Sequence, residues 1–150
     1  MKRIVATCIA LVASVLFAAA QPAKEHYSPG LGEFMTATQL RHAKLWFAGK
    51  TNNWDLAAYE IDEIAEGLED AEKQFPTHDG IPVADMIKAN IDPAVEELRK
   101  AVGAKSGTKF AVAFDKLTSA CNTCHTGVNK QFIRIQRRIS SPLSNQKFAP

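Results

Sequence analysis

The sequence predicts an all-α fold, an antiparallel four-helix bundle, on three observations. After residue 30, apolar residues recur at spacings of three and four positions, the period of a helix with one buried face. No convincing stretch of four or more residues shows the period-two alternation that is typical of a strand. Short segments containing Pro, Gly or Asn divide the apolar pattern into four parts. Helices joined by such short connections pack as antiparallel neighbours.

Composition sets the class of protein. The 150 residues are 46% hydrophobic and 23% charged, which suits one globular domain. The 8 glycines and 7 prolines follow no repeat, and this excludes a fibrous or disordered chain.

The first twenty residues, 1–20, have the pattern of a secretory signal peptide. Lys2 and Arg3 precede a run of seventeen residues without charge, which ends in three alanines. Small residues at that point fit the cleavage site of a signal peptidase. An uncleaved anchor is the alternative, because a run of this length reaches the lower limit for spanning a bilayer. Residues 21–30 contain two prolines and are predicted to form an extended leader.

Cleavage changes both the charge and the cysteine count. It removes Lys2 and Arg3, so the formal net charge falls from +2 to zero. It also removes Cys8, which leaves Cys121 and Cys124 as the two cysteines of a 130-residue mature chain. We therefore expect export to the periplasm of a bacterium, which is an oxidising compartment.

Two helices are predicted in the first half of the mature chain. The first covers 31–48, with Gly49 as its C-cap. The second covers 54–75, because seven apolar residues along it keep the 3-4 spacing of an a/d seam. Asn52 or Asn53 caps its start, and a proline follows its end immediately.

The second half predicts two more helical regions. One covers 83–104, with a break where Asp92 acts as N-cap and Pro93 occupies the first helical position. The other begins near Thr108 and runs into the 130s, because its apolar face continues as far as Ile139.

Together the predicted helices occupy residues 31–139, which are expected to form the bundle. Residues 140–150 contain two prolines and are predicted to be a loose C-terminal tail.

The residues Cys121-Asn122-Thr123-Cys124-His125 form a CxxCH sequence, the pattern by which c-type haem is attached. On a helix, the two cysteines lie on one face about a turn apart, within reach of the two vinyl groups of one porphyrin. His125 then faces the iron and supplies a proximal nitrogen ligand. We therefore expect one covalent haem c inside the bundle.

Three other interpretations of the motif are weaker. A thioredoxin-like thiol pair is expected within a βαβ pattern, which the sequence lacks. A zinc site needs four ligands, and none of His26, His42 and His78 is paired with a second cysteine. A disulfide between Cys121 and Cys124 closes a very small loop and stabilises little. A helical module without haem, carrying a free thiol pair, stays as an alternative.

With its signal peptide, four helices and CxxCH on the last helix, the chain resembles the cytochrome c′ family over residues 31–139. The resemblance implies a haem held between the first and last helices. It implies either a low-spin electron carrier with a distal methionine, here Met35, or five-coordinate iron that binds nitric oxide or carbon monoxide. The resemblance leaves a homodimer open, because bundles of this family often pair through their first helices, but no residue pattern in the sequence indicates one. The chain departs from the family pattern at one position. Many members have an Arg or Lys four residues after the CxxCH histidine, on the proximal side, whereas this chain has Asn129 there and Lys130 next.

The distal ligand has three candidates. Met35 and His42 are seven residues apart, so both project from one face of the first helix. Methionine opposite histidine raises the reduction potential of a haem, whereas two histidines give a lower one. We expect Met35 as the ligand, with an open position and His42 as alternatives. Arg41 shares the same stripe and either pairs with a haem propionate or snorkels to the surface.

Charge is unevenly distributed along the chain. Residues 55–72 carry eight acids and no base, whereas Lys116 and the residues after it carry six bases and no acid. A solvated face on each helix, together with attraction between the helices, explains this pattern, and the alternative is that the basic end steers an acidic redox partner protein. We expect no nucleic-acid binding by a neutral exported domain, and no membrane contact after cleavage. No catalytic triad or phosphate-binding glycine loop is present in the sequence, so we expect no enzyme.

Overall fold

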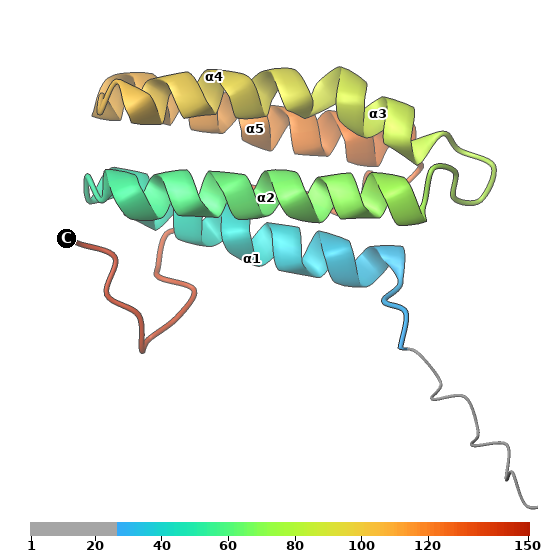
Figure 1. Ribbon diagram of the computed structural model, residues 1–150, viewed down its shortest axis with the longest axis horizontal. Coiled ribbons are helices and arrows are strands. Elements are labelled where there is room, and N and C mark those ends of the chain that lie inside the picture. Colours follow the sequence, from blue (N-terminus) through green and yellow to red (C-terminus); the bar gives the residue numbers. More distant parts are fainter. Residues whose placement is uncertain (1–26) are drawn as a thin grey trace, which may run out of the picture.

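A computed structural model describes residues 27–150, and this part of the chain is all-helical. Its five helices are α1 (Leu31–Lys50), α2 (Trp54–Gln74), α3 (Val83–Asn90), α4 (Asp92–Gly103) and α5 (Gly107–Gly127) (Figure 1). The described residues contain no strand, only an isolated bridge between His78 and Ile81. The all-α prediction is therefore confirmed for these residues. The predicted signal peptide and most of the leader lie outside them.

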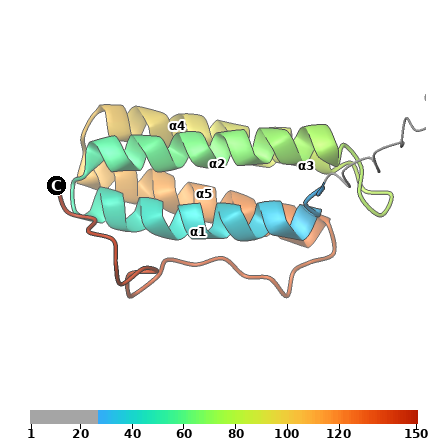
Figure 2. The ribbon, with the colours of Figure 1, turned by 60° about the horizontal axis from the view of Figure 1, so that its bottom comes forward.

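The helices enclose one hydrophobic core. Helix α1 packs against α2, α2 against α4, α4 against α5, and α5 against α1 (Figures 1 and 2). All five helices, including the short α3, contribute buried side chains to the core. The core side chains are aliphatic and aromatic, and the most deeply buried large ones are Leu45, Ile61, Ile64, Ile87, Leu98, Phe110, Phe114 and Leu117. Among the described helices, none is both long and apolar enough to cross a membrane.

Helix α2 confirms the seam that the spacing predicts. Five consecutive seam positions are buried, and these are Ala57, Ile61, Ile64, Leu68 and Ala71. Asn53 is the N-cap, and its side chain accepts a hydrogen bond from the Leu56 amide at 3.2 Å. This bond satisfies one of the amide groups that every helix leaves unpaired at its start.

Helix α1 extends two residues beyond its predicted end, so the prediction of Gly49 as a C-cap is wrong. Gly49 lies inside the helix and is buried beneath the ring of Phe110. A β-carbon at this position would lie 2.1 Å from Cζ of Phe110. Glycine is needed here because a neighbouring helix approaches closely, not because the chain turns.

The third helical region breaks as predicted, with a small difference at the cap. Helix α3 ends at Asn90 and α4 begins at Asp92, with proline in the first turn. Ile91 occupies the N-cap position, and Asp92 is already helical, which corrects the predicted N-cap by one residue. Proline is tolerated at this position because an N–H group in the first turn would have no acceptor within the helix.

Helix α5 ends at Gly127, so the prediction that it continues into the 130s is wrong. Asn129 has a φ of 58°, a left-handed conformation that reverses the chain. The amide of Lys130 then donates to the carbonyl of His125 at 2.7 Å. Residues 128–139, which we call the strap, return along α1 and α5 without helical structure (Figure 2).

The end of the tail is fixed, which contradicts the prediction of a loose segment at 140–150. Phe148 is buried, and its ring lies 5.6 Å from that of Phe47. Its carbonyl accepts hydrogen bonds from the side chains of Thr51 and Asn53, each at 2.9 Å. The tail therefore closes over the connection between α1 and α2.

Candidate cofactor site

The CxxCH residues of α5 face α1 across two adjoining cavities. The larger cavity measures about 390 Å³. Both cavities are lined by Met35, Cys124 and His125, and the smaller one is also lined by Cys121 and His42. Apolar side chains make up most of the remaining walls, and these include Leu68, Ile87, Ile91 and Ile135. The structure thus brings together all five residues that the sequence singles out.

The two cysteines are free thiols in a desolvated setting. Both are partly buried and border the core. Burial raises the pKa of Cys121 to about 12, and it also raises the pKa of Cys124. A reactive redox pair needs the opposite shift, because the thiolate is the nucleophile.

The ring of His125 is oriented by the strap. Its Nδ1 lies 3.0 Å from the carbonyl oxygen of Ile133. A carbonyl can only accept, so Nδ1 carries the hydrogen and donates it. The neutral ring therefore has its lone pair on Nε2, the nitrogen that is left for a metal ion.

Met35 lies opposite the motif on α1. Its side chain is partly buried, packs against the core and lines both cavities. A thioether is a soft ligand, and this one borders the same two cavities as His125.

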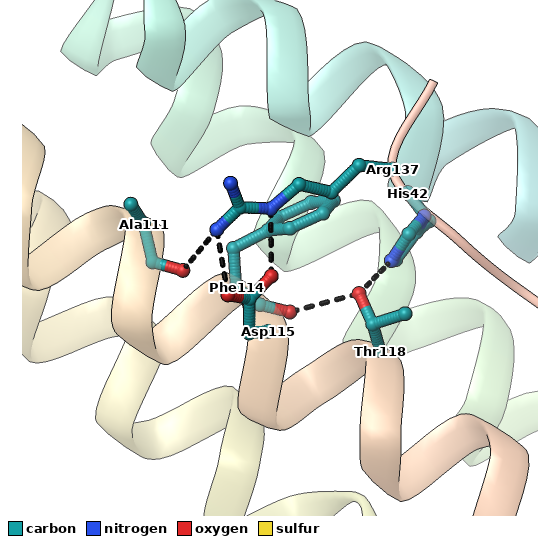
Figure 3. Close-up of polar contacts among 6 residues, drawn as sticks. All are labelled: His42, Ala111, Phe114, Asp115, Thr118 and Arg137. Atoms are coloured by element: carbon teal, nitrogen blue, oxygen red, sulfur yellow. Dashed lines mark hydrogen bonds and ion pairs between the residues drawn. The ribbon is translucent and has the colours of Figure 1, made fainter. Parts of the chain in front are cut away.

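His42 is buried and already engaged in a hydrogen-bond chain (Figure 3). Thr118 donates its hydroxyl hydrogen to the carbonyl of Phe114 at 2.9 Å. The same hydroxyl oxygen lies 2.8 Å from Nε2 of His42, so that nitrogen must be the donor. The imidazole also packs on Phe114, with 4.4 Å between ring centroids. Desolvation lowers its pKa to about 4, so the ring is neutral near pH 7.

Arg41 points to α2 rather than to the cavities. Its guanidinium lies 3.3 Å from a carboxylate oxygen of Glu60 and 2.5 Å from one of Glu63. It also lies over the ring of Tyr59, 5.5 Å from the centroid. Arg41 therefore lines neither cavity, and the structure offers no support for its pairing with a haem propionate.

The residues that fix the strap carry no signal in the sequence. Asn122, between the two cysteines, exchanges two hydrogen bonds with the backbone of Ile135, at 2.9 and 2.8 Å. Arg137 forms a two-pronged ion pair with Asp115, at 2.6 and 2.7 Å (Figure 3). Its guanidinium also covers the ring of Trp46, 4.2 Å from the ring centroid. No sequence pattern indicates these contacts, because they join segments that are 13 or more residues apart.

The proximal side differs from the pattern that the resemblance implies. Asn129 lies beyond the end of α5, in the left-handed turn, so it cannot cover the motif from a further helical turn. Lys130 lines the larger cavity from the strap. His78, a weaker candidate from the sequence, also lines this cavity, and its Nε2 lies 3.6 Å from the carboxylate of Asp79.

The residues that line the two cavities include the side-chain types that a covalently attached haem uses. In the part of the chain that the structure describes, no three His, Cys, Asp or Glu side chains gather in a way that could hold an ion. Haem iron needs only axial ligands from the protein, because the porphyrin supplies the other four. The residues present provide two thiols, one imidazole nitrogen, one thioether and apolar walls.

Comparison with protein-family models, with curated protein sequences and with solved structures finds no match to this chain.

Proposed function

We propose that this protein is an exported c-type cytochrome that transfers single electrons. One observation carries the proposal. The two thiols and the free Nε2 of His125 border apolar cavities that have a thioether on the opposite wall. A bound haem would supply an iron that alternates between the ferric and ferrous states. No enzymatic activity is part of the proposal.

Cys121 and Cys124 would hold the porphyrin covalently. Each thiol would add across one vinyl group, with a carbon–sulfur bond formed and the thiol hydrogen passed to the neighbouring vinyl carbon. This addition needs no oxidant and no reductant. The two bonds would hold the haem at α5 and leave His125, the residue after Cys124, available to the iron.

Met35 is the distal residue that we favour. It lines both cavities together with His125, and no hydrogen bond engages its side chain. His42 would have to give up its bond to Thr118 before its Nε2 could bind iron. Because His42 is buried, that bond is costly to lose. These contacts support ligation by His125 and Met35.

The finer architecture that we propose is an antiparallel four-helix bundle of the cytochrome c′ kind. Helix α3 and helix α4 would act as one broken helix between α2 and α5. The connections support this arrangement, because only 51–53 separate α1 from α2 and only 104–106 separate α4 from α5. Such short loops place successive helices side by side in opposite directions.

The strap supports a further part of the proposal, an acidic redox partner protein in the periplasm. Lys130, Arg134 and Arg138 are exposed on it. Lys130 lines the larger of the two cavities that would hold the haem, and the two arginines line a neighbouring cavity that shares His42 and Ile135 with the smaller one. A cluster of positive charge attracts an acidic partner and speeds its encounter.

Mass spectrometry and absorption spectra of the protein from periplasmic expression test the proposal. We expect the mass to rise by one haem on a chain that begins after residue 20, and the ferrous spectrum to show the sharp α-band of low-spin iron. A chain without haem would refute the proposed function. Five-coordinate spectra with rapid binding of carbon monoxide would instead indicate a gas-binding protein.

Substitution of Met35 tests the distal ligand. Met35→Ala should convert the low-spin spectrum to a high-spin one, because the sixth position loses its ligand. Met86→Ala is the matched control, because Met86 is a partly buried methionine that lines neither cavity. Unchanged spectra in both variants would remove Met35 as a ligand.

A further inference from the structure

We infer that Asn122 and the strap form a positioning device for His125. The backbone carbonyl of Ile133 fixes the ring, and Asn122 fixes the backbone that carries this carbonyl. The inference rests on the proposed function, because the role that we assign is a role toward haem iron. The residues that carry this role lie outside the Cys, Cys and His positions of the CxxCH signature.

The first step is the tautomer of His125. Nδ1 donates to the Ile133 carbonyl at 3.0 Å, and this bond fixes both the rotation of the ring and the nitrogen that stays bare. A metal-bound histidine with such a bond is a stronger electron donor than one without it.

The second step is the position of the Ile133 carbonyl itself. Ile133 and its neighbour Phe132 are 42% and 75% exposed, so neither side chain is anchored in the core. Backbone hydrogen bonds hold this part of the strap. The amide of Ile133 donates to the carbonyl of Lys130 at 2.8 Å, and the amide of Lys130 donates to the carbonyl of His125 at 2.7 Å.

The third step is the pair of hydrogen bonds between Asn122 and Ile135, which we call the clamp and which lies on the other side of Ile133. The side chain of Asn122 donates to the Ile135 carbonyl at 2.9 Å and accepts from the Ile135 amide at 2.8 Å. An asparagine side chain carries both a donor and an acceptor, so it can pair with one residue of an extended backbone as a strand would. Arg137 anchors the strap two residues further on through Asp115.

This arrangement links a residue between the cysteines to the electronic state of the iron. Loss of the clamp frees the strap and weakens the bond from Nδ1. A weaker donor destabilises ferric iron more than it destabilises ferrous iron, so the reduction potential rises. Each tenfold change in the preference for ferric over ferrous iron corresponds to about 59 mV.

The test compares the haem-loaded wild type with Asn122→Ala and Thr123→Ala. Thr123 is the control, because it is the other residue between the cysteines and its side chain is exposed. We expect Asn122→Ala to raise the reduction potential and to speed exchange of the His125 Nδ1 proton with D₂O, measured by NMR of the ferrous protein. Thr123→Ala should leave both unchanged.

Ile135→Pro provides a second variant in case Asn122→Ala takes up no haem. It removes the Ile135 amide and leaves the whole CxxCH sequence intact, so it should shift the potential and the exchange rate in the same direction. If the variants that carry haem match the wild type in both quantities, the inference is wrong while the proposed function stands. A wild type that carries no haem overturns both.

Discussion

Among single residues, Glu60 departs most from its expected setting. The acidic run at 55–72 suggests a solvated face, yet the side chain of Glu60 is fully buried. Its oxygens lie 3.3 Å from Arg41 and 2.5 Å from Nζ of Lys44, both on α1. A buried carboxylate persists only when such partners offset its lost hydration. Glu60 therefore joins α2 to α1 rather than facing solvent.

Glu60→Ala should lower the free energy of unfolding by about 2 to 4 kcal/mol, because two cations at the helix interface lose their shared partner. Denaturant titration measures this loss. Glu63→Ala is the control, since Glu63 contacts the same Arg41 from a partly exposed position. It should cost no more than about 1 kcal/mol. Equal losses in the two variants would contradict the role given to Glu60.

His42 predicts a dependence of stability on pH. Its pKa is about 4 in the folded protein and about 6.5 when unfolded, because burial disfavours the charged ring. Between these values the unfolded chain binds more protons, so stability is complete above pH 6.5 and falls as the pH drops toward 4. The loss should be about 3 kcal/mol.

The measurement is a series of denaturant titrations between pH 7 and pH 4 on the wild type and on His42→Gln. Carboxylates titrate in both proteins, so the difference between the two curves isolates the histidine. Parallel curves would show that His42 does not titrate as its burial implies.

At the scale of elements, the contact between α1 and α5 depends on Gly49. Gly49→Ala should lower the free energy of unfolding by about 1 to 3 kcal/mol, because the new methyl group overlaps the ring of Phe110. Gly103→Ala in α4 serves as the control, since a β-carbon there meets nothing within 4 Å. It should leave stability unchanged or raise it by up to about 1 kcal/mol. Thermal or chemical unfolding measures both variants, and no loss of stability in Gly49→Ala would show that the close approach is absent.

The C-terminal tail is a second element whose stability can be measured. Phe148→Ala should cost about 2 to 4 kcal/mol, because the ring is buried against Phe47. Ile139→Ala, which changes an isoleucine that is 99% exposed on the strap, should stay within about 0.5 kcal/mol of the wild type. Denaturant titration compares the two. A negligible effect of Phe148→Ala would mean that the tail is loose after all.

For the whole molecule, the proposed haem would be part of the core. It would fill the space between α1 and α5 and bury apolar porphyrin surface against walls such as Ile87 and Ile91. The folded chain without haem should therefore be less stable than the loaded protein.

A double variant, Cys121→Ser with Cys124→Ser, tests this at the level of the whole molecule. It should carry no covalent haem and should melt at least about 10 °C below the loaded wild type, as measured by circular dichroism. Equal melting temperatures would mean that the cofactor contributes nothing to the fold.

The relation between sequence and fold follows from the range of the interactions. The seam of α2 and its Asn53 cap were predictable, because helical spacing and capping depend on residues within a few positions of each other. The end of α5 was not predictable in this way. The apolar spacing continues past Gly127 to Ile139, but these residues are not buried by a helix, and a left-handed turn at Asn129 ends the pattern.

The sequence by itself determined that the chain is helical and that two thiols and an imidazole share one turn of the last helix. Local periodicity and the CxxCH spacing suffice for both. Only the tertiary structure decided that Met35 lies across a cavity from His125 and that the strap fixes the His125 tautomer. It also decided that Nε2 of His42 is hydrogen-bonded to the hydroxyl of Thr118. These contacts join residues distant along the chain, so they exist only once packing has brought the helices together.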